Sequence, residues 1–162
     1  MNDGYRGILD SIASDSPTPG GGSVAALCLA HAHSLAAMVA RLTVASEKWS
    51  DGHEIASEVI ERSDEAISDS LALADRDADA FDSVMAAYRM PKNKGFRESR
   101  KQAIREATIG AAIVPLETLV SASELLHRLL ELSRECNSNA LTDLASSAEL
   151  AHTAARMAEM NV

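Results

Sequence analysis

Residues 20–45 read GGGSVAALCLAHAHSLAAMVARLTVA, and this stretch decides the fold. After the glycines, apolar or weakly polar side chains recur at alternating steps of three and four residues, which is the spacing of a seam on a helix. The members of this seam are Cys28, His31, Leu35, Met38, Leu42 and Ala45. The other faces are largely alanine, so neighbouring helices can approach on several sides. We therefore predict a central helix with Ser23 as its N-cap that ends near Ala45.

Helical spacing continues on both sides of this segment. We predict a short amphipathic helix over 5–13 and a long helix that opens on an Asp51–Glu54 capping box and ends near Tyr88. A further helix over 96–133 contains Pro115, which should kink it, and a last helix follows ECNSNALTD to about Met160. No alternating strand pattern occurs in the sequence. The fold class is thus predicted to be all-α, an up-and-down bundle of about four long helices plus a short N-terminal helix, in one domain over 1–162.

Apolar stripes on the two longest helices predict how they pack. The helix that ends near Tyr88 carries a seam of Ile67, Leu71, Ala74, Ala78, Phe81, Met85 and Tyr88. After Pro115 there are two stripes, one of Leu116, Leu119, Leu126 and Leu130 and one of Leu125, Leu129 and Leu132. A surface helix of a small bundle needs only one apolar face. The second stripe therefore predicts a homodimer.

Composition limits the classes of partner. The chain has 162 residues, a formal net charge of -9 and no cluster of Lys and Arg, which argues against nucleic acid as a partner. Two isolated cysteines indicate a reducing, cytoplasmic setting. The first ten residues lack the order of a signal peptide. The most apolar run, Val24 to Ala40, falls short of a membrane span, so no membrane partner is expected.

The glycine loop in DSPTPGGGS, residues 15–23, is the first candidate binding element. It lacks the lysine of a phosphate-binding P-loop, and no strand precedes it. Backbone N–H groups at the start of a helix can bind a carboxylate or a close-lying ring. A sharp turn beneath another helix is the alternative, and on pattern alone it is the commoner use of glycine.

Four aspartates crowd the segment ALADRDADAFD, namely Asp75, Asp77, Asp79 and Asp82. Asp77 lies one helical turn before Phe81 and therefore borders the apolar seam, whereas Asp79 points away from it. A carboxylate at the edge of a core suits a proton carrier. The alternative is a solvated acidic face, which is the usual role of surface aspartates.

Other polar residues form weaker patterns. Cys28 and His31 share a helix face, but His33 projects elsewhere and no fourth ligand follows, so no metal site is predicted. The segment CNSNALTD offers amide and carboxylate groups that could bind the edge of a heterocycle, although Asn139 or Thr142 could instead cap the last helix.

Five segments occur in the order and approximate spacing of one known family: TPGGGSVAAL, AAMVARLT, DADAFDSVMAAYRMPK, VPLE and CNSNALTDLASSAELA. On these segments, which extend over nearly the whole chain, the sequence resembles the formiminotetrahydrofolate cyclodeaminase and methenyltetrahydrofolate cyclohydrolase family. The resemblance implies an all-helical homodimer that binds tetrahydrofolate derivatives. Family members often have Gly-Asn-Pro-Asn where this chain has Cys136-Asn137-Ser138-Asn139, and they usually continue past the position of Val162.

The resemblance also implies roles for individual residues. Asp77 matches the expected catalytic carboxylate, and Lys48 and Lys92 match lysines that could meet the glutamate tail of a folate. The remaining residues implied to bind substrate are Gly20, Gly21, Gly22, Ser23, Asn137, Asn139 and Asp143. The implied reaction is ring closure of 5-formiminotetrahydrofolate with loss of ammonia, and it needs no metal or redox cofactor. A cyclohydrolase is the first alternative, and a non-catalytic folate-binding or dimerisation module is the second.

Overall fold

The computed structural model describes residues 2–162, with side chains from Gly4 onward, and within this range the chain is helical without a strand. The α-helices are α1 (Asn2–Ile12), α2 (Gly21–Val44), α3 (His53–Arg89), α4 (Arg97–Leu132) and α5 (Leu141–Glu159). Short 3-10 turns precede three of them: η1 (Glu47–Gly52), η2 (Lys94–Phe96) and η3 (Ser138–Ala140). The predicted all-α bundle is confirmed, and the helices lie close to their predicted bounds.

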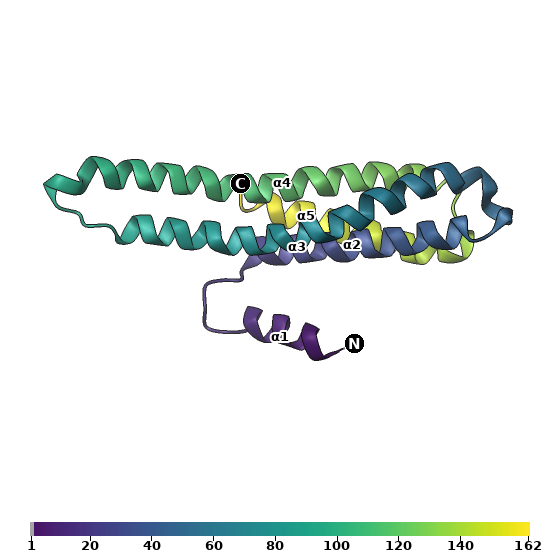
Figure 1. Cartoon of the computed structure of the whole chain (residues 1–162), viewed down its shortest axis with the longest axis horizontal. Helices are drawn as coiled ribbons and strands as arrows, with labels where there is room; N and C mark the ends of the chain where they lie inside the picture. The colour runs from purple at the N-terminus through teal and green to yellow at the C-terminus, as the bar shows by residue number, and fades with distance from the viewer. Residues whose placement is uncertain (1) are drawn as a thin grey trace.

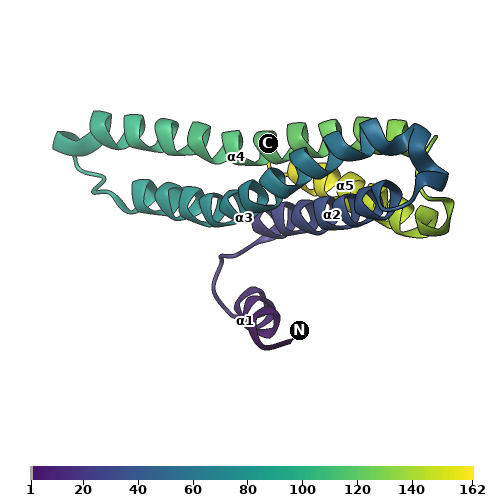
Figure 2. The same cartoon turned by 45° about the vertical axis from the view of Figure 1, so that its right-hand side comes forward.

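The four long helices lie side by side, and a loop joins α1 to them (Figure 1). α1 contacts α2 through the rings of Tyr5 and His31, whose centroids are 5.7 Å apart in an edge-to-face arrangement. α2 packs against α3, α4 and α5, which makes it the central helix that the sequence predicts. α3 and α4 continue past the first turn of α2 and form a two-helix arm (Figures 1 and 2). The start of α2, the end of α5 and the middle of α3 therefore meet at about the centre of the long axis.

The core lies on the alanine face of α2, so the predicted seam on this helix is wrong. His31, Met38, Leu42 and Ala45 are exposed, while Cys28 and Leu35 are only half-buried. The fully buried side chains of α2 lie on the faces outside the predicted seam. They include Ala25, Ala26, Leu29, Ala32, Ala36, Val39 and Ala40. Alanine is small enough for three neighbouring helices to approach α2 closely, and this dense contact outweighs the larger side chains of the seam.

Both predicted N-caps are also wrong. Gly20 occupies the N-cap position of α2, and the hydroxyl of Ser23 is used in a contact with another helix instead. Neither Asp51 nor Glu54 caps α3, because the chain passes through η1 before α3 begins. Gly52 ends η1 against the backbone of Glu135, so the contact between two loops sets the start of α3.

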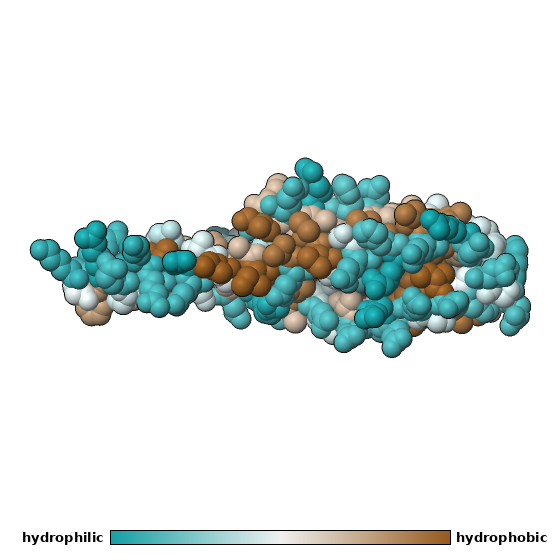
Figure 3. Space-filling view, turned by 90° about the horizontal axis from the view of Figure 1, so that it is seen from above, coloured by the Kyte–Doolittle hydropathy of each residue, from teal (hydrophilic) through white to brown (hydrophobic). Residues whose placement is uncertain are grey.

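The stripes of α3 and α4 are only partly buried. On α3, Ala74 is buried, whereas Phe81 and Tyr88 are exposed because α3 extends beyond the start of α2. Leu71 is exposed where it lines a cavity together with Leu27 of α2. On α4, the stripe of Leu125, Leu129 and Leu132 enters the core, while the other stripe stays half-buried or exposed. Figure 3 shows apolar side chains gathered along the middle of one face of the bundle. α4 continues through Pro115, which is buried, and shows no sharp kink in Figure 1.

Two helical segments are long and apolar enough to cross a membrane, Gly21–Val44 and Lys94–Leu132. This corrects the sequence estimate, which placed the first segment below the required length. In α2, however, 61% of the most apolar window is buried inside the bundle. Because the core helix of a helical protein passes the same test, the length of these helices is weak support for a membrane span.

Candidate active site

The first turn of α2 presents backbone N–H groups that no side chain of the described chain caps. Gly20 is extended, with φ -112° and ψ -157°, and its carbonyl accepts the first helical bond, from Val24 N–H at 3.0 Å. The N–H groups of residues 21–23 precede that bond and therefore have no acceptor within α2. No acidic side chain lies in this turn, so the positive end of the helix dipole is not compensated by the helix itself.

Asp77 of α3 lies directly against this turn. The Ser23 hydroxyl donates a hydrogen bond to Asp77 Oδ2 at 2.9 Å, and the carboxylate is half-buried. A Cβ added to Gly22 would lie 2.6 Å from Asp77 Cγ and would overlap the carboxylate oxygens. The lack of a side chain at Gly22 therefore allows α3 to approach α2 closely. In contrast, a Cβ added to Gly21 would have no atom within 4 Å, so this residue faces open space.

A cavity of about 270 Å³ opens beside this contact. Its walls come from the glycine loop, α2, α3, α4 and the turn that follows α5. Its lining residues are Pro17, Thr18, Gly20, Gly21, Gly22, Asp77, Phe81, Ala111 and Asn161. The cavity thus combines backbone amides, one carboxylate and one aromatic ring. Such a set can bind a flat, polar heterocycle and can move a proton at its edge.

Three residues of this cavity are not among the residues that the sequence indicates for binding: Phe81, Ala111 and Asn161. The helical spacing predicts Phe81 in the core seam of α3, yet its side chain is 40% exposed and lines the cavity one turn after Asp77. The four-residue spacing of Asp77 and Phe81 is a signal that could have indicated their shared face. Asn161 lies two residues after the end of α5, and its position carries no such signal, because only the packing of α5 against α2 brings it here.

The neighbouring aspartates differ from Asp77 in their surroundings. Asp75, Asp79 and Asp82 are exposed. Arg76 and Glu117 join α3 to α4 beside the site, with guanidinium–carboxylate distances of 2.6 and 3.0 Å. The hydrogen bonds from Arg76 lower the pKa of the Glu117 carboxyl, although this exposed pair contributes little to stability.

The structure does not bring the other predicted binding residues to Asp77 within one chain. Lys48 lies in η1 at the far end of α2, with Nζ 4.5 Å from the centre of the Trp49 ring. A helix of 24 residues is about 36 Å long, so Lys48 and the glycine loop are widely separated. Lys92 is exposed in the turn at the tip of the α3–α4 arm.

The polar turn before α5 also lies at the far end of α2. Asn137 accepts a hydrogen bond from Asn139 N–H at 3.0 Å, and its own N–H donates to Thr43 Oγ1 at 3.0 Å. Asp143 follows in the first turn of α5. Neither Asn139 nor Thr142 caps α5, whose N-cap is Ala140. Asn137 therefore fastens the α4–α5 connection to the end of α2.

The two histidines and the single cysteine of α2 do not converge. His31 Nδ1 lies 2.6 Å from the Leu27 carbonyl oxygen, whereas the His33 ring is buried against Ser63 of α3. Burial raises the pKa of the Cys28 thiol. No group of three His, Cys, Asp or Glu side chains is arranged to hold a metal ion in the part of the chain that the structure describes.

Comparisons of the sequence and of the fold with known proteins agree on one family. The model of the formiminotransferase-cyclodeaminase family matches residues 5–162. A methenyltetrahydrofolate cyclohydrolase of Methylorubrum extorquens is 32% identical over 162 residues, which is 99% of this chain and 78% of that protein. The formimidoyltransferase-cyclodeaminase of Mus musculus is 31% identical, and the match extends over 100% of this chain but only 30% of the longer mouse protein.

A solved structure agrees with these matches. The crystal structure of a formiminotetrahydrofolate cyclodeaminase from Thermotoga maritima superposes with a TM-score of 0.87 at 30% sequence identity, over 97% of this chain and 75% of that one. The family model, the relatives and the fold thus point the same way. The chain belongs to the formiminotransferase-cyclodeaminase family.

Proposed function

We propose that this chain is an enzyme of folate one-carbon metabolism, a formiminotetrahydrofolate cyclodeaminase. The observation that carries the proposal is the half-buried Asp77 carboxylate, held by Ser23 against the glycine turn at the edge of a cavity. The Thermotoga maritima and Mus musculus relatives are named for cyclodeaminase activity, which supports the same choice.

The proposed chemistry uses Asp77 as the proton carrier. N10 of 5-formiminotetrahydrofolate attacks the carbon of the protonated formimino group, and Asp77 accepts the proton that N10 loses. Asp77 then returns a proton to the former imino nitrogen, whose bond to carbon breaks as ammonia leaves. The product is the cationic 5,10-methenyl bridge, which a nearby carboxylate stabilises. This sequence of proton transfers requires no metal or redox cofactor, and we propose none.

A cyclohydrolase is the second candidate. Water would add to the same cationic carbon of 5,10-methenyltetrahydrofolate, and Asp77 would accept a proton from that water. The relative from Methylorubrum extorquens is named for this activity, and it matches nearly the whole of this chain. An Asp77 side chain pointing freely into solvent would favour a non-catalytic folate-binding module. The half-buried Asp77, bonded to Ser23, favours the enzyme instead.

We also propose that the active form is a homodimer in the cytoplasm. Besides the two predicted stripes, α4 carries a third row of apolar side chains that are each about half exposed and suit a second copy of the chain: Ile109, Ile113, Leu116 and Val120. If Lys48 and the turn at Asn137 serve the same folate as Asp77, they must come from that second copy, since about 36 Å separates the two ends of α2 in one chain.

The test of the proposed function is turnover of each folate by two matched variants. Asp77→Asn keeps the size of the side chain but cannot accept a proton, so turnover should fall by about 10²- to 10⁴-fold. Asp79→Asn, on the exposed side of the same helix, should be nearly silent. Formation or loss of the methenyl chromophore is followed together with ammonia, which separates deaminase from cyclohydrolase activity. Equal, small losses in both variants would contradict the role of Asp77.

A further inference from the structure

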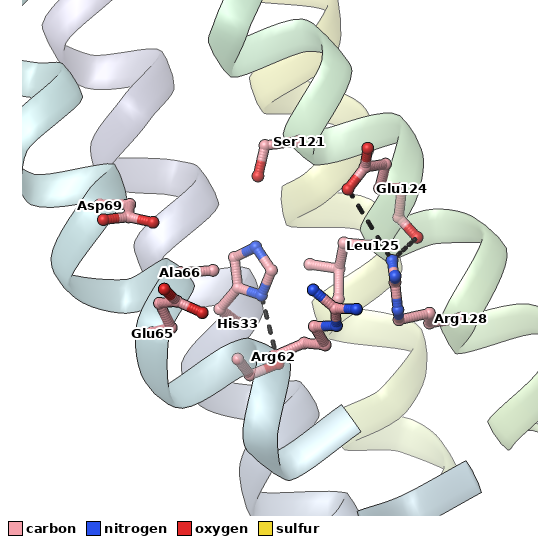
Figure 4. A pocket seen from close by; sticks show the side chains of 10 residues that line it. His33, Arg62, Glu65, Ala66, Asp69, Ser121, Glu124, Leu125 and Arg128 are labelled. Carbon is pink, nitrogen blue, oxygen red and sulfur yellow. Dashed lines mark hydrogen bonds and ion pairs between the residues drawn. The ribbon is translucent and has the colours of Figure 1, made fainter. Parts of the chain in front are cut away.

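A second cavity, of about 160 Å³, lies between α2, α3 and α4 (Figure 4). His33 forms its floor, and polar side chains from α3 and α4 form its rim. His33 lies eleven residues beyond Gly22 on α2, which corresponds to about 16 Å along the helix. The cavity is therefore separate from the candidate active site.

The His33 ring is 95% buried, since its relative exposure is 5%, and only one of its nitrogens is hydrogen-bonded. Nδ1 lies 3.2 Å from the Ser63 hydroxyl oxygen, whereas Nε2 has no partner among the described protein atoms. The Ser63 hydroxyl has no other hydrogen-bond partner among the described residues, and we assign it as the donor to Nδ1. The imidazole proton then resides on Nε2, which Figure 4 shows directed toward Ser121 across the cavity. A buried N–H donor without an acceptor requires a partner.

Further donors surround the same space. Ser121 makes no side-chain hydrogen bond within the described chain, and its hydroxyl faces the cavity in Figure 4. Arg62 forms no ion pair with any described residue, and its guanidinium points into the cavity beside His33. Arg128 completes the α4 side, where it donates to the Glu124 carbonyl oxygen at 3.2 Å. The cavity thus presents donors on several sides to one small volume.

The charges of the rim decide which acceptor fits. Arg62 and Arg128 face three carboxylates, those of Glu65, Asp69 and Glu124. Figure 4 shows Glu65 and Asp69 on the α3 side, away from Arg128. The mixed rim disfavours a doubly charged anion, while a single negative charge can pair locally with a guanidinium. The volume equals about five water molecules, enough for a carboxylate and a few attached atoms.

We propose that this cavity binds a small monocarboxylate, with His33 Nε2–H and the Ser121 hydroxyl donating to its oxygens and Arg62 supplying the opposite charge. Burial and the nearby Arg128 lower the pKa of His33 to about 4, so the imidazole is neutral before binding and can donate only through Nε2. A carboxylate beside Nε2 favours the imidazolium and therefore raises the pKa of His33.

The experiment titrates the full chain with sodium formate at constant ionic strength and follows the imidazole nitrogens of His33 by NMR. His33→Gln assigns the signals among the five histidines. Sodium chloride and sodium phosphate are the comparison arms. We expect formate, but not chloride, to shift the His33 signals in a saturable way and to raise the pKa of His33.

Arg62→Gln is the test variant, and Arg105→Gln, an exposed arginine on α4 outside this cavity, is its matched control. Both side chains are exposed, so both variants should fold, which circular dichroism verifies. Arg62→Gln should weaken formate binding about tenfold or more, and Arg105→Gln should leave it unchanged. An absent or non-saturable shift with formate would overturn the proposal. Equal binding by the two variants, or tighter binding of phosphate than of formate, would also overturn it.

Discussion

The contact between Gly22 and Asp77 allows a sharp test with a single methyl group. In Gly22→Ala, the new Cβ would lie 2.6 Å from Asp77 Cγ, too close for two carbon atoms that are not bonded. The surrounding helix backbones are fixed by close packing, so the carboxylate must rotate away from α2. Gly21→Ala adds the same methyl group one residue earlier, where no atom lies within 4 Å, and is the matched control.

The expected change in stability is small. Rotation of Asp77 breaks the bond from the Ser23 hydroxyl, and a hydrogen bond to a charged group contributes about 1.5–3 kcal/mol. Asp77 is half-exposed, so the lower part of that range applies. Alanine in place of glycine in a helix recovers about 1 kcal/mol. Gly22→Ala should therefore lower the free energy of unfolding by about 1 kcal/mol or less, whereas Gly21→Ala should raise it slightly.

The expected change in activity is large. If the position of the Asp77 carboxylate matters for proton transfer, Gly22→Ala should lose most of the 10²- to 10⁴-fold contribution of a general acid–base group, an approximate range. Turnover is measured with each folate, and urea unfolding is followed by circular dichroism. In the Asp77→Asn background, Gly22→Ala should cause little further loss, because both changes remove the same function. Turnover by Gly22→Ala that equals turnover by the wild type would refute the reasoning.

Three further predictions concern other parts of the chain. Gly21→Val should weaken folate binding, measured by calorimetry, while the circular dichroism spectrum stays unchanged, because the branched side chain would fill the cavity without clashing with the protein. An unchanged folate affinity would mean that the glycine loop serves only as a turn. The pKa of His33 is lowered from 6.5 to about 4, so the stability that the neutral ring contributes is full above pH 6.5 and is lost as the pH falls toward 4. Between pH 7 and pH 5, urea unfolding of the wild type should lose about 2 kcal/mol more than that of His33→Gln, and parallel pH profiles would contradict this origin. Light scattering at micromolar concentration should show a dimer that Ile113→Glu converts to monomer, and a monomeric wild type would exclude the proposed interface.

The sequence by itself determined the helical class and the positions of the helices. Its long apolar repeats have helical spacing, and the turns at ECNSNALTD and after Pro91 interrupt them, so local spacing and local backbone chemistry were sufficient. The same spacing separated Asp77 from Asp79, because two residues on one helix differ in direction by a fixed angle.

Only the tertiary structure decided which face of each helix is buried and which residues share a site. Periodicity identifies apolar stripes but does not show which stripe is buried. In α2 the alanine face is buried and the seam at Met38 and Leu42 is exposed, because three helices pack closely only against small side chains. The contact of Gly22 with Asp77 joins α2 to α3, the place of Asn161 depends on α5, and the separation of Lys48 from Asp77 is set by the length of α2. These relations are distances between segments far apart in the chain, and no pattern within one segment contains them.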